Sequence, residues 1–271
     1  MKLPIPIFHQ ENVYDEVEVT KPKAGVLADT SEYIDKGDIF SAMFTFVAGS
    51  VVEIKAESPV TSKEMIKTLI RRLPFRSAEI VTIGILKELG VEDGVEGLYE
   101  CPLCHAKQYS QIDDDEELDT RDYISNLSIQ YMDNVEGSFT VTLQEPIEIK
   151  DARNGNVLSS VESVTLHHPT LIDTIRAFQK QGNASTVRRQ FAIYAEALEK
   201  IGDEIVDTPF RNLWAMYVFE RLDINSLNEI GSIVSQYGMD NTVQKSCGEC
   251  GKKWKAELDT SNFFVSGLRP R

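Results

Sequence analysis

The stretch Cys101-Pro102-Leu103-Cys104 has a counterpart near the end of the chain, Cys247-Gly248-Glu249-Cys250, and the two stretches contain all four cysteines of the sequence. A Cys-x-x-Cys spacing lets two neighbouring thiolates reach one tetrahedral ion at about 2.3 Å each. Two such pairs supply the four sulfur ligands of a structural zinc site. The sequence therefore predicts one shared, structural Zn²⁺ ion, bound by Cys101, Cys104, Cys247 and Cys250.

Each pair is followed by a short polar segment with an aromatic residue, residues 105–109 ending in Tyr109 and residues 251–254 ending in Trp254. A turn leading into such a segment is typical of the knuckle-and-strand half of a zinc ribbon. Ribbons usually separate their pairs by about 15–20 residues, whereas residues 105–246 lie between them here. We therefore expect a long insertion. His105 adjoins the first knuckle and is expected to be a bystander, because four cysteines complete the coordination.

Other uses of the cysteines fit the sequence less well. Disulfides need an oxidising compartment, and residues 1–7 contain no long apolar segment of the kind found in export signals. Residues 101–105 match the Cys-x-x-Cys-His pattern of c-type haem attachment, but the second pair lacks the histidine. A thioredoxin-like redox site needs a helix after its cysteines. Residues 108–119 are too polar and acidic to continue as that helix.

The composition permits one large domain or two ordinary ones, because the chain has 271 residues and is 42% hydrophobic. It has no apolar run near 18 residues, so no membrane span is expected. Its 43 acidic and 28 basic residues give a net charge of −15, which disfavours broad contact with a phosphate backbone. Arg71-Arg72 and Lys252-Lys253 leave local basic patches open, although a solvated surface is the simpler expectation.

The N-terminal half is expected to be mainly helical. Residues 1–60 are interpreted as an arm or edge-strand region with an apolar segment, 39–54, that forms a buried helix or a helix and then a strand, with a break at Gly49-Ser50. A capping box at residues 61–64 predicts a helix that ends before Pro74. A buried helix over 77–89, with Gly90 after its end, and a strand over 97–100 lead to the first knuckle.

The insertion is expected to begin with β-structure and to continue with helices. Residues 113–117 are all acidic but lack the alternation and the glycine of a calcium loop, so an exposed loop is predicted. Strands are expected over 123–132, 138–149 and 157–166, with a hairpin turn at residues 154–156. Four helices should follow, beginning at Thr170, at Thr186 (ending near Ile201), at Thr208-Pro209 and at a second capping box, Ser226–Glu229.

Catalytic motifs are absent from the sequence. It contains no Gly-x-Gly-x-x-Gly, no phosphate loop ending in Lys-Ser/Thr and no Gly-x-Ser-x-Gly. His167-His168-Pro169 lies at a strand-to-helix junction and is the one cluster among four histidines. A surface turn is the simpler interpretation, and an enzyme that uses His167 or His168 is the third hypothesis. Residues 259–264, with two consecutive phenylalanines, are expected to close the core beneath the ribbon or to anchor a partner.

The order of these segments resembles that of the baseplate hub and tail assembly proteins of contractile-tailed, T-even-like bacteriophages. The resemblance is carried by residues 99–104, Cys247–Gly251 and the C-terminal stretch 258–264, which includes Ser261-Asn262-Phe263-Phe264. It implies a non-enzymatic structural or assembly protein that binds other tail and baseplate proteins, in several copies, first in the host cytoplasm and then in the virion tail. It also implies that the four cysteines hold a zinc ion that replaces part of a core.

The sequence thus predicts an α+β protein with a helical N-terminal half and a four-cysteine zinc ribbon split by a long β-then-α insertion. The expected segments are 1–60, 61–110 with the helix pair and first knuckle, 111–168 with the β-rich insert, 169–240 with the helical insert, and 241–271 with the second knuckle and a C-terminal anchor. The expected function is assembly of a phage tail baseplate through protein contacts. The alternative is a zinc-ribbon factor associated with nucleic acid or transcription.

Overall fold

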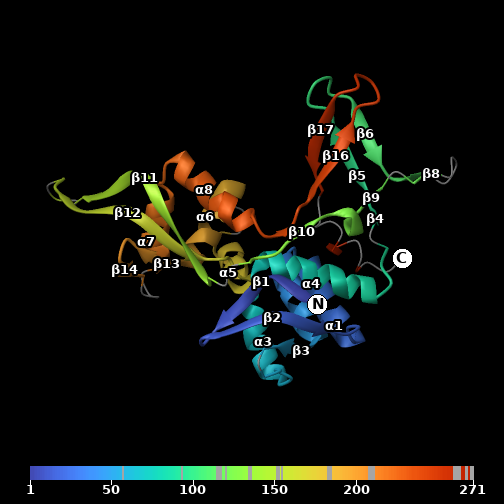
Figure 1. The fold of residues 1–271 in the computed structure, drawn as a ribbon, viewed down its shortest axis with the longest axis horizontal. Helices are drawn as coiled ribbons and strands as arrows, with labels where there is room; N and C mark the ends of the chain where they lie inside the picture. The colour runs from blue at the N-terminus through green and yellow to red at the C-terminus, as the bar shows by residue number, and fades with distance from the viewer. Residues whose placement is uncertain are drawn as a thin grey trace.

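A computed structural model describes the chain except for residues 57, 93, 114–117, 120, 134–135, 151–152, 154, 182–184, 207–210, 259–263, 266–267 and 269–271. Figure 1 shows three parts: a body formed by residues 1–89, a ribbon that projects from it, formed by residues 97–110 and 242–257, and a lobe formed by residues 138–235. Helices and strands are mixed along the chain, as expected of an α+β protein.

The body contains an antiparallel sheet of three strands, β1 (Lys2–His9), β2 (Asn12–Val19) and β3 (Val51–Lys55), in that spatial order. The pairing of β1 with β2 is irregular between Lys2 and Ile7. Pro4 and Pro6 lie in this stretch and have no N–H group to donate, which explains both the irregularity and the position of β1 at the sheet edge.

Four helices complete the body: α1 (Ala24–Asp35), α2 (Ile39–Ser50), α3 (Lys63–Arg71) and α4 (Phe75–Glu88). Helix α2 is apolar around most of its circumference and is therefore buried among the other helices. It runs directly into β3, which confirms the expected helix followed by a strand, although Gly49 and Ser50 are the last two residues of the helix and the break follows them.

The ends of the body helices agree only in part with the sequence signals. Gly90 follows α4 with a φ of 80°, as expected for a glycine after a helix. Ser62 precedes α3, but its side chain makes no capping hydrogen bond, so the predicted capping box does not form. Asp38 caps α2, and its carboxylate accepts a hydrogen bond from the Ser41 N–H at 3.0 Å.

Of the two interpretations of the N-terminal segment, the arm was wrong and the edge strand is confirmed, because β1 lies at the edge of the body sheet. Residues 1–60 supply all three strands of the body sheet and two of its helices, and Leu3, Ile7 and Val17 belong to the body core. The N-terminal half is consequently a helix-and-sheet unit and not simply helical. The scattered apolar residues alternate with charges because one face of β2 is exposed.

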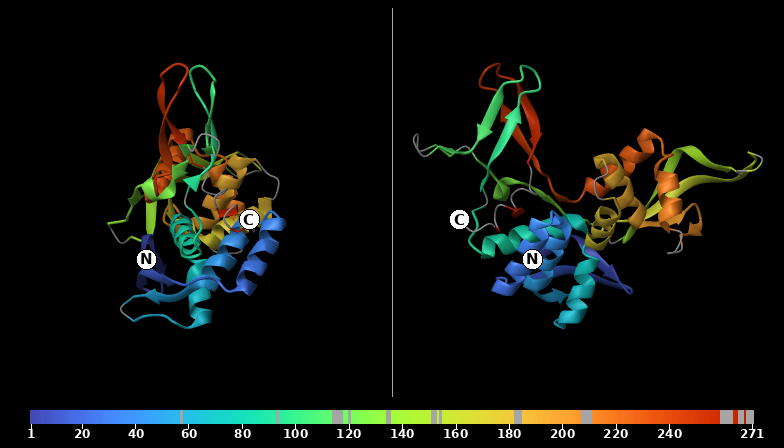
Figure 2. Two further views of the ribbon diagram at one scale, coloured as in Figure 1. Left: turned by 90° about the vertical axis from the view of Figure 1, so that its right-hand side faces the viewer. Right: turned by 180° about the vertical axis from the view of Figure 1, so that it is seen from behind.

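The ribbon consists of two antiparallel hairpins that are far apart in sequence. The first pairs β5 (Gly97–Glu100) with β6 (Lys107–Ser110), and the second pairs β16 (Thr242–Ser246) with β17 (Lys253–Glu257). All views in Figures 1 and 2 show the two hairpins side by side, with their tips at the same end. The long insertion therefore returns the chain to the place where it left.

Short strand pairs hold the chain around the ribbon. Strand β4 (Gly94–Val95) pairs with β9 (Asp122–Tyr123), and β7 (Ile112–Asp113) pairs with β8 (Leu118–Asp119). The expected strand over 123–132 was wrong: it is divided into β9, a 3₁₀ turn over Ile124–Asn126, and β10 (Ile129–Gln130). Residues 114–117, which belong to the predicted exposed loop and to the calcium-loop alternative, lie outside the described part of the chain.

A two-stranded stem connects the body to the lobe. Strand β10, on the way into the lobe, pairs with β15 (Gly238–Met239), on the way out. The lobe itself contains the antiparallel sheet β11-β12-β13-β14, formed by β11 (Ser138–Lys150), β12 (Val157–His167), β13 (Leu198–Ile201) and β14 (Glu204–Ile205). The predicted strands over 138–149 and 157–166 are confirmed.

Four helices accompany this sheet: α5 (Leu171–Gln181), α6 (Thr186–Ala197), α7 (Arg211–Phe219) and α8 (Ile224–Ser235). Two predicted boundaries were wrong. Helix α6 ends at Ala197, because the following residues pair with β12 as β13. Helix α8 begins after Asp223, whose carboxylate accepts hydrogen bonds from the N–H groups of Asn225 and Ser226. The predicted Thr208-Pro209 start lies outside the described residues.

The described residues form two separate hydrophobic cores. One belongs to the body and the other to the lobe, where it is built from β11 to β13 and α6 to α8. Leu171 of α5 belongs to the body core, and its N–H donates to the carbonyl of Leu73 at 3.0 Å. The Phe75 N–H likewise donates to the carbonyl of Pro169 at 2.8 Å. Helix α5 and the residues just before it therefore join the lobe to the body in addition to the stem.

The C-terminal part returns to the body. Phe264 is buried, and its ring lies 5.6 Å from that of Phe46 in α2. This contact supports core closure by one of the two consecutive phenylalanines. The rest of the predicted anchor, residues 259–263, lies outside the described part of the chain. No helix among the described residues has the length and apolarity needed to cross a membrane.

Candidate metal centre

The four cysteines meet at the tip of the ribbon, with their sulfur atoms all within 4.8 Å of one another. The Sγ atoms of Cys101 and Cys250 are 3.7 Å apart, and those of Cys104 and Cys247 are 3.6 Å apart. Four sulfurs at about 2.3 Å from one tetrahedral ion would be separated by about 3.8 Å. None of the four is in a disulfide. The predicted site residues are thus brought together, and their geometry fits a single metal ion.

The two knuckles have the same backbone turn. The N–H of His105 donates to the carbonyl of Cys101 at 3.0 Å, and the N–H of Gly251 donates to that of Cys247 at 2.9 Å. His105 and Gly251 have φ values of 59° and 72°, in the left-handed region. This conformation reverses the chain directly after the second cysteine, which brings both sulfurs of a pair to one side.

The knuckles are also equivalent in exposure. Cys101 and Cys247, the first cysteine of each pair, are buried, whereas Cys104 and Cys250 are exposed. The N–H of Cys101 donates to the carbonyl of Ala106, and the N–H of Cys247 to that of Lys252, so each buried cysteine is fixed to its own hairpin. The site therefore has an approximate two-fold relation between two independent segments of the chain.

The thiols of Cys101 and Cys104 do not ionise independently of their neighbours. A hydrogen bond from the backbone N–H of Cys104 lowers the pKa of Cys101 to about 6. The backbone N–H of Ala106 favours the thiolate of Cys104, but the thiols of Cys250 and Cys247 outweigh it and raise the pKa of Cys104. One thiolate thus suppresses ionisation of its neighbours. A bound divalent ion would remove this conflict, because it would allow all four sulfurs to bind as thiolates.

Beneath the cysteines, a cluster of polar side chains fastens the hairpins together. The Asp122 carboxylate accepts hydrogen bonds from the Tyr99 hydroxyl at 2.8 Å and the Ser110 hydroxyl at 3.2 Å. The Lys245 ammonium lies 2.6 Å from the same carboxylate and 4.3 Å from the centre of the Tyr99 ring. Asp122 therefore connects the first hairpin, which holds Tyr99 and Ser110, to the second hairpin, which holds Lys245.

The environment of this cluster is partly dry. The side chains of Lys245 and Asp122 are each 15% exposed. Burial, and then the hydrogen bond to Asp122, raises the pKa of Tyr99. The Gln108 amide adds a direct link between hairpins, because it donates to the Ser246 carbonyl at 3.0 Å. Sequence patterns did not identify Asp122 or Lys245, because their pairing depends on a return of the chain after more than a hundred residues.

His105 lies outside the sulfur cluster. Its Nδ1 atom is 2.7 Å from the Glu100 carboxylate, and both side chains are well exposed. Its main structural contribution is the left-handed backbone conformation of the first knuckle. The expected bystander role relative to the four sulfurs agrees with this arrangement.

The histidine pair has a different environment from the predicted surface turn. The Nε2 atom of His167 is 2.8 Å from Asp173 and its Nδ1 atom is 3.4 Å from Glu199. Burial disfavours the imidazolium, but the two carboxylates outweigh burial and raise the pKa of His167 to about 9. A cationic imidazole held by two carboxylates is not available as a base at neutral pH. His167 therefore fits a role in joining β12, α5 and β13.

His168 is buried between two aromatic rings, those of Phe139 at 5.2 Å and Tyr237 at 6.0 Å. Burial, with a smaller contribution from the charge of His167, lowers the pKa of His168 to about 4. Its imidazole is consequently neutral at pH 7. Neither His167 nor His168 belongs to the group of described residues whose ligand atoms lie close enough together to share a metal ion.

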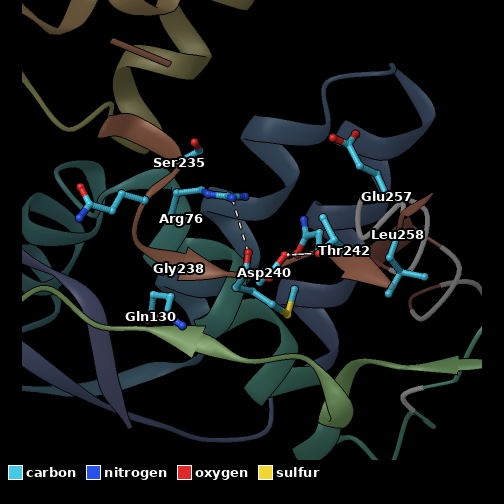
Figure 3. A pocket seen from close by; sticks show the side chains of 11 residues that line it. Arg76, Gln130, Ser235, Gly238, Asp240, Thr242, Glu257 and Leu258 are labelled. Carbon is cyan, nitrogen blue, oxygen red and sulfur yellow. Dashed lines mark hydrogen bonds between the residues drawn. The ribbon is translucent and has the colours of Figure 1, made fainter. Parts of the chain in front are cut away.

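A polar cleft of about 490 Å³ lies where the body, stem and ribbon meet. Figure 3 shows Arg76 of α4, Gly238 and Asp240 after the lobe, and Glu257 near the end of β17 around this cleft. The Arg76 guanidinium pairs with Glu79 at 3.1 Å and donates to the Met239 carbonyl at 3.5 Å. This contact attaches the stem to the body and so helps to set the direction in which the ribbon projects.

Comparisons with protein-family models, with curated protein sequences and with solved structures gave no match. The resemblance to phage baseplate and tail assembly proteins therefore stays a prediction. The features of this chain that bear on its function are the geometry of the cysteine cluster and the surfaces around it.

Proposed function

We propose that this protein is a non-enzymatic assembly component whose ribbon, held by one structural zinc ion, presents a contact surface to another protein. The observation that carries the proposal is the convergence of four sulfur atoms from two distant segments at the tip of a projecting hairpin pair. A site with four cysteine ligands has no open coordination position, which suits a structural role better than a catalytic one.

Zinc is the ion that the ligand set favours. Four thiolates in a tetrahedral arrangement are typical of zinc or of iron–sulfur sites, and Cys-x-x-Cys knuckles in hairpin turns are typical of zinc. Each half of the ribbon is a hairpin of only two short strands, so the ribbon has little apolar surface of its own to bury. Metal–sulfur bonds supply the stability that such a small unit cannot obtain from a core.

The first hairpin carries the surface that supports a protein partner. Leu98, Leu103 and Tyr109 are 52%, 65% and 63% exposed, and Leu98 is directly opposite Tyr109 on the outer face of the hairpin. Large apolar side chains that gather on one exposed face are common at protein interfaces. By the resemblance given above, the partners would be other components of a phage tail baseplate.

The proposed contact can be tested by site-specific photo-crosslinking in the cells that make this protein. Replacing Tyr109 with benzoylphenylalanine should give a discrete crosslink to one protein, and mutation of the cysteines should abolish it. The matched control is the same replacement at Gln244, which is exposed on the second hairpin. An absence of protein crosslinks at Tyr109, or equal crosslinking at both positions, would contradict the proposal.

A nucleic-acid-binding ribbon is the second candidate, and one observation favours it. Four lysines are exposed on the ribbon of an otherwise acidic chain: Lys107, Lys252, Lys253 and Lys255. If they contact phosphates, binding of a fluorescent oligonucleotide should weaken steeply as salt rises from 50 to 200 mM, as general counterion release requires. Replacing Lys252 and Lys253 with Gln should reduce that salt dependence. No binding at about 50 mM salt would exclude this candidate.

A further inference from the structure

A groove between the body and the lobe has the features of a ligand site that is independent of the cysteine cluster. Three neighbouring hollows, of about 190, 230 and 300 Å³, all have Phe40 in their walls. The Phe40 ring lies edge-on to Phe75 of the body at 5.7 Å and to Phe178 of α5 at 5.6 Å. The hollows therefore surround one aromatic residue at the seam between the two hydrophobic cores.

Three buried polar atoms in residues that line these hollows have no hydrogen-bond partner among the described residues: the Nε atom of Arg76, whose other two nitrogens are paired, and two atoms in side chains that make no hydrogen bond at all. These two are the Thr82 hydroxyl oxygen, in a residue that is 2% exposed, and the Nδ1 atom of His168, in a residue that is 6% exposed. Thr82 lines the hollow of 190 Å³, and His168 lines that of 230 Å³. Buried polar groups in native proteins are almost always hydrogen-bonded, so two orphans around one groove indicate that something else satisfies them.

The groove also contains one cation without an ionic partner. Arg189, in the first part of α6, lines two of the three hollows. Its guanidinium makes no ion pair with any residue that the structure describes. The carboxylate of Glu79, which also lines the first hollow, is already paired with Arg76. In a chain with a net charge of −15, an unpaired arginine at the rim of an apolar groove points to an anionic group.

We propose that this groove binds a small amphiphilic carboxylate, with its apolar chain or ring against Phe40 and its anionic end at Arg189. The apolar walls exclude water around the ligand body, and the few polar groups fix its orientation, as in other small-molecule sites. The neutral imidazole of His168 and the Thr82 hydroxyl are placed to hydrogen-bond a polar substituent. Because the groove is lined by α2 and α4 on one side and by α5 and α6 on the other, an occupied site would also stabilise the lobe against the body.

Calorimetric titration with octanoate and with 1-octanol tests this proposal on the full-length, metal-loaded protein. Octanoate should bind at a single site, and Arg189→Gln should weaken it about tenfold, as expected for loss of one charge-assisted hydrogen bond. Arg189→Gln should leave the binding of 1-octanol unchanged. Arg188→Gln, an exposed neighbour on the same helix, is the matched control and should alter neither.

Two further variants should block the groove. Ile193 lines the hollows of 230 and 300 Å³, so the larger side chain of Ile193→Trp should fill space in both. Thr186 lines the hollow of 300 Å³ from an exposed position outside both hydrophobic cores, so Thr186→Trp should fill that hollow without disturbing the cores. Both should abolish binding of octanoate and 1-octanol. The proposal is overturned if neither compound binds the wild-type protein, if Arg188→Gln weakens octanoate as much as Arg189→Gln, or if Thr186→Trp leaves both affinities unchanged.

Discussion

At the scale of single residues, two groups of side chains lie between the hairpins of the ribbon: the four cysteines at its tip and the cluster around Asp122 beneath them. The spacing of Cys101 to Cys104 and of Cys247 to Cys250 is a local property, since it depends only on one turn of backbone. The residues that hold the hairpins together are not visible in this way. Asp122 and Lys245 become partners only through the fold, and no local pattern marks either of them.

The Asp122 cluster is predicted to stabilise the ribbon. Asp122→Asn removes the charge that pairs with Lys245 and leaves a partly buried ammonium without a counterion. We expect the free energy of unfolding of the ribbon to fall by about 1–3 kcal/mol. Urea unfolding monitored by Trp254 fluorescence, in a Trp214→Phe background, measures it. Glu100→Gln, which removes an exposed partner of His105, is the control and should change nothing.

His167 is predicted to make stability depend on pH. Because the pKa of His167 is raised from 6.5 to about 9 in the folded protein, its contribution is complete below pH 6.5 and is lost as pH rises through 9. The loss should be of the order of 3 kcal/mol. Urea unfolding followed by circular dichroism between pH 6 and 10 should show this decline, and His167→Gln should flatten it. His9→Gln should leave the decline unchanged. Burial, with the charge of Arg72, lowers the pKa of His9 below its usual value of 6.5, so this histidine titrates below the pH range of the decline.

At the scale of elements, prediction succeeded where one strand or helix meets the core with a regular period. The β11–β12 hairpin and α2 followed by β3 are such cases. It failed where pairing with a distant strand decides the structure: residues 198–201 continue the helical period of α6, yet they pair with β12 as β13. The pairing of β2 with β3 was missed for the same reason, because two helices separate these strands in the sequence.

The stem between body and lobe is predicted to require Gly238. This glycine has a φ of 102°, and a Cβ atom would lie 2.9 Å from the Cβ of Arg76. Gly238→Ala should therefore lower the free energy of unfolding by about 1–3 kcal/mol. Gly248→Ala is the matched control, since a Cβ atom there would meet nothing within 4 Å and proline occupies the equivalent position of the first knuckle. Equal thermal stability of the two variants would contradict this account of the stem.

At the scale of the whole molecule, the structure consists of two units with their own cores and a ribbon that carries the four-cysteine cluster at its tip. None of the four cysteines belongs to either hydrophobic core. Removal of the metal should therefore loosen the ribbon and leave the body and lobe folded. Hydrogen exchange followed by mass spectrometry, with and without a chelator, should show faster exchange in residues 97–110 and 242–257 and unchanged exchange in α4 and β11. Global unfolding on chelation would contradict the division.

The central claim is that one metal ion joins two segments that are far apart in the sequence. X-ray absorption at the zinc edge of the purified protein tests it most directly. We predict a single shell of four sulfur atoms at about 2.3 Å, with one zinc ion per chain. A shell with two sulfurs and two nitrogen or oxygen ligands would show instead that each cysteine pair binds its own ion, and would contradict the shared site.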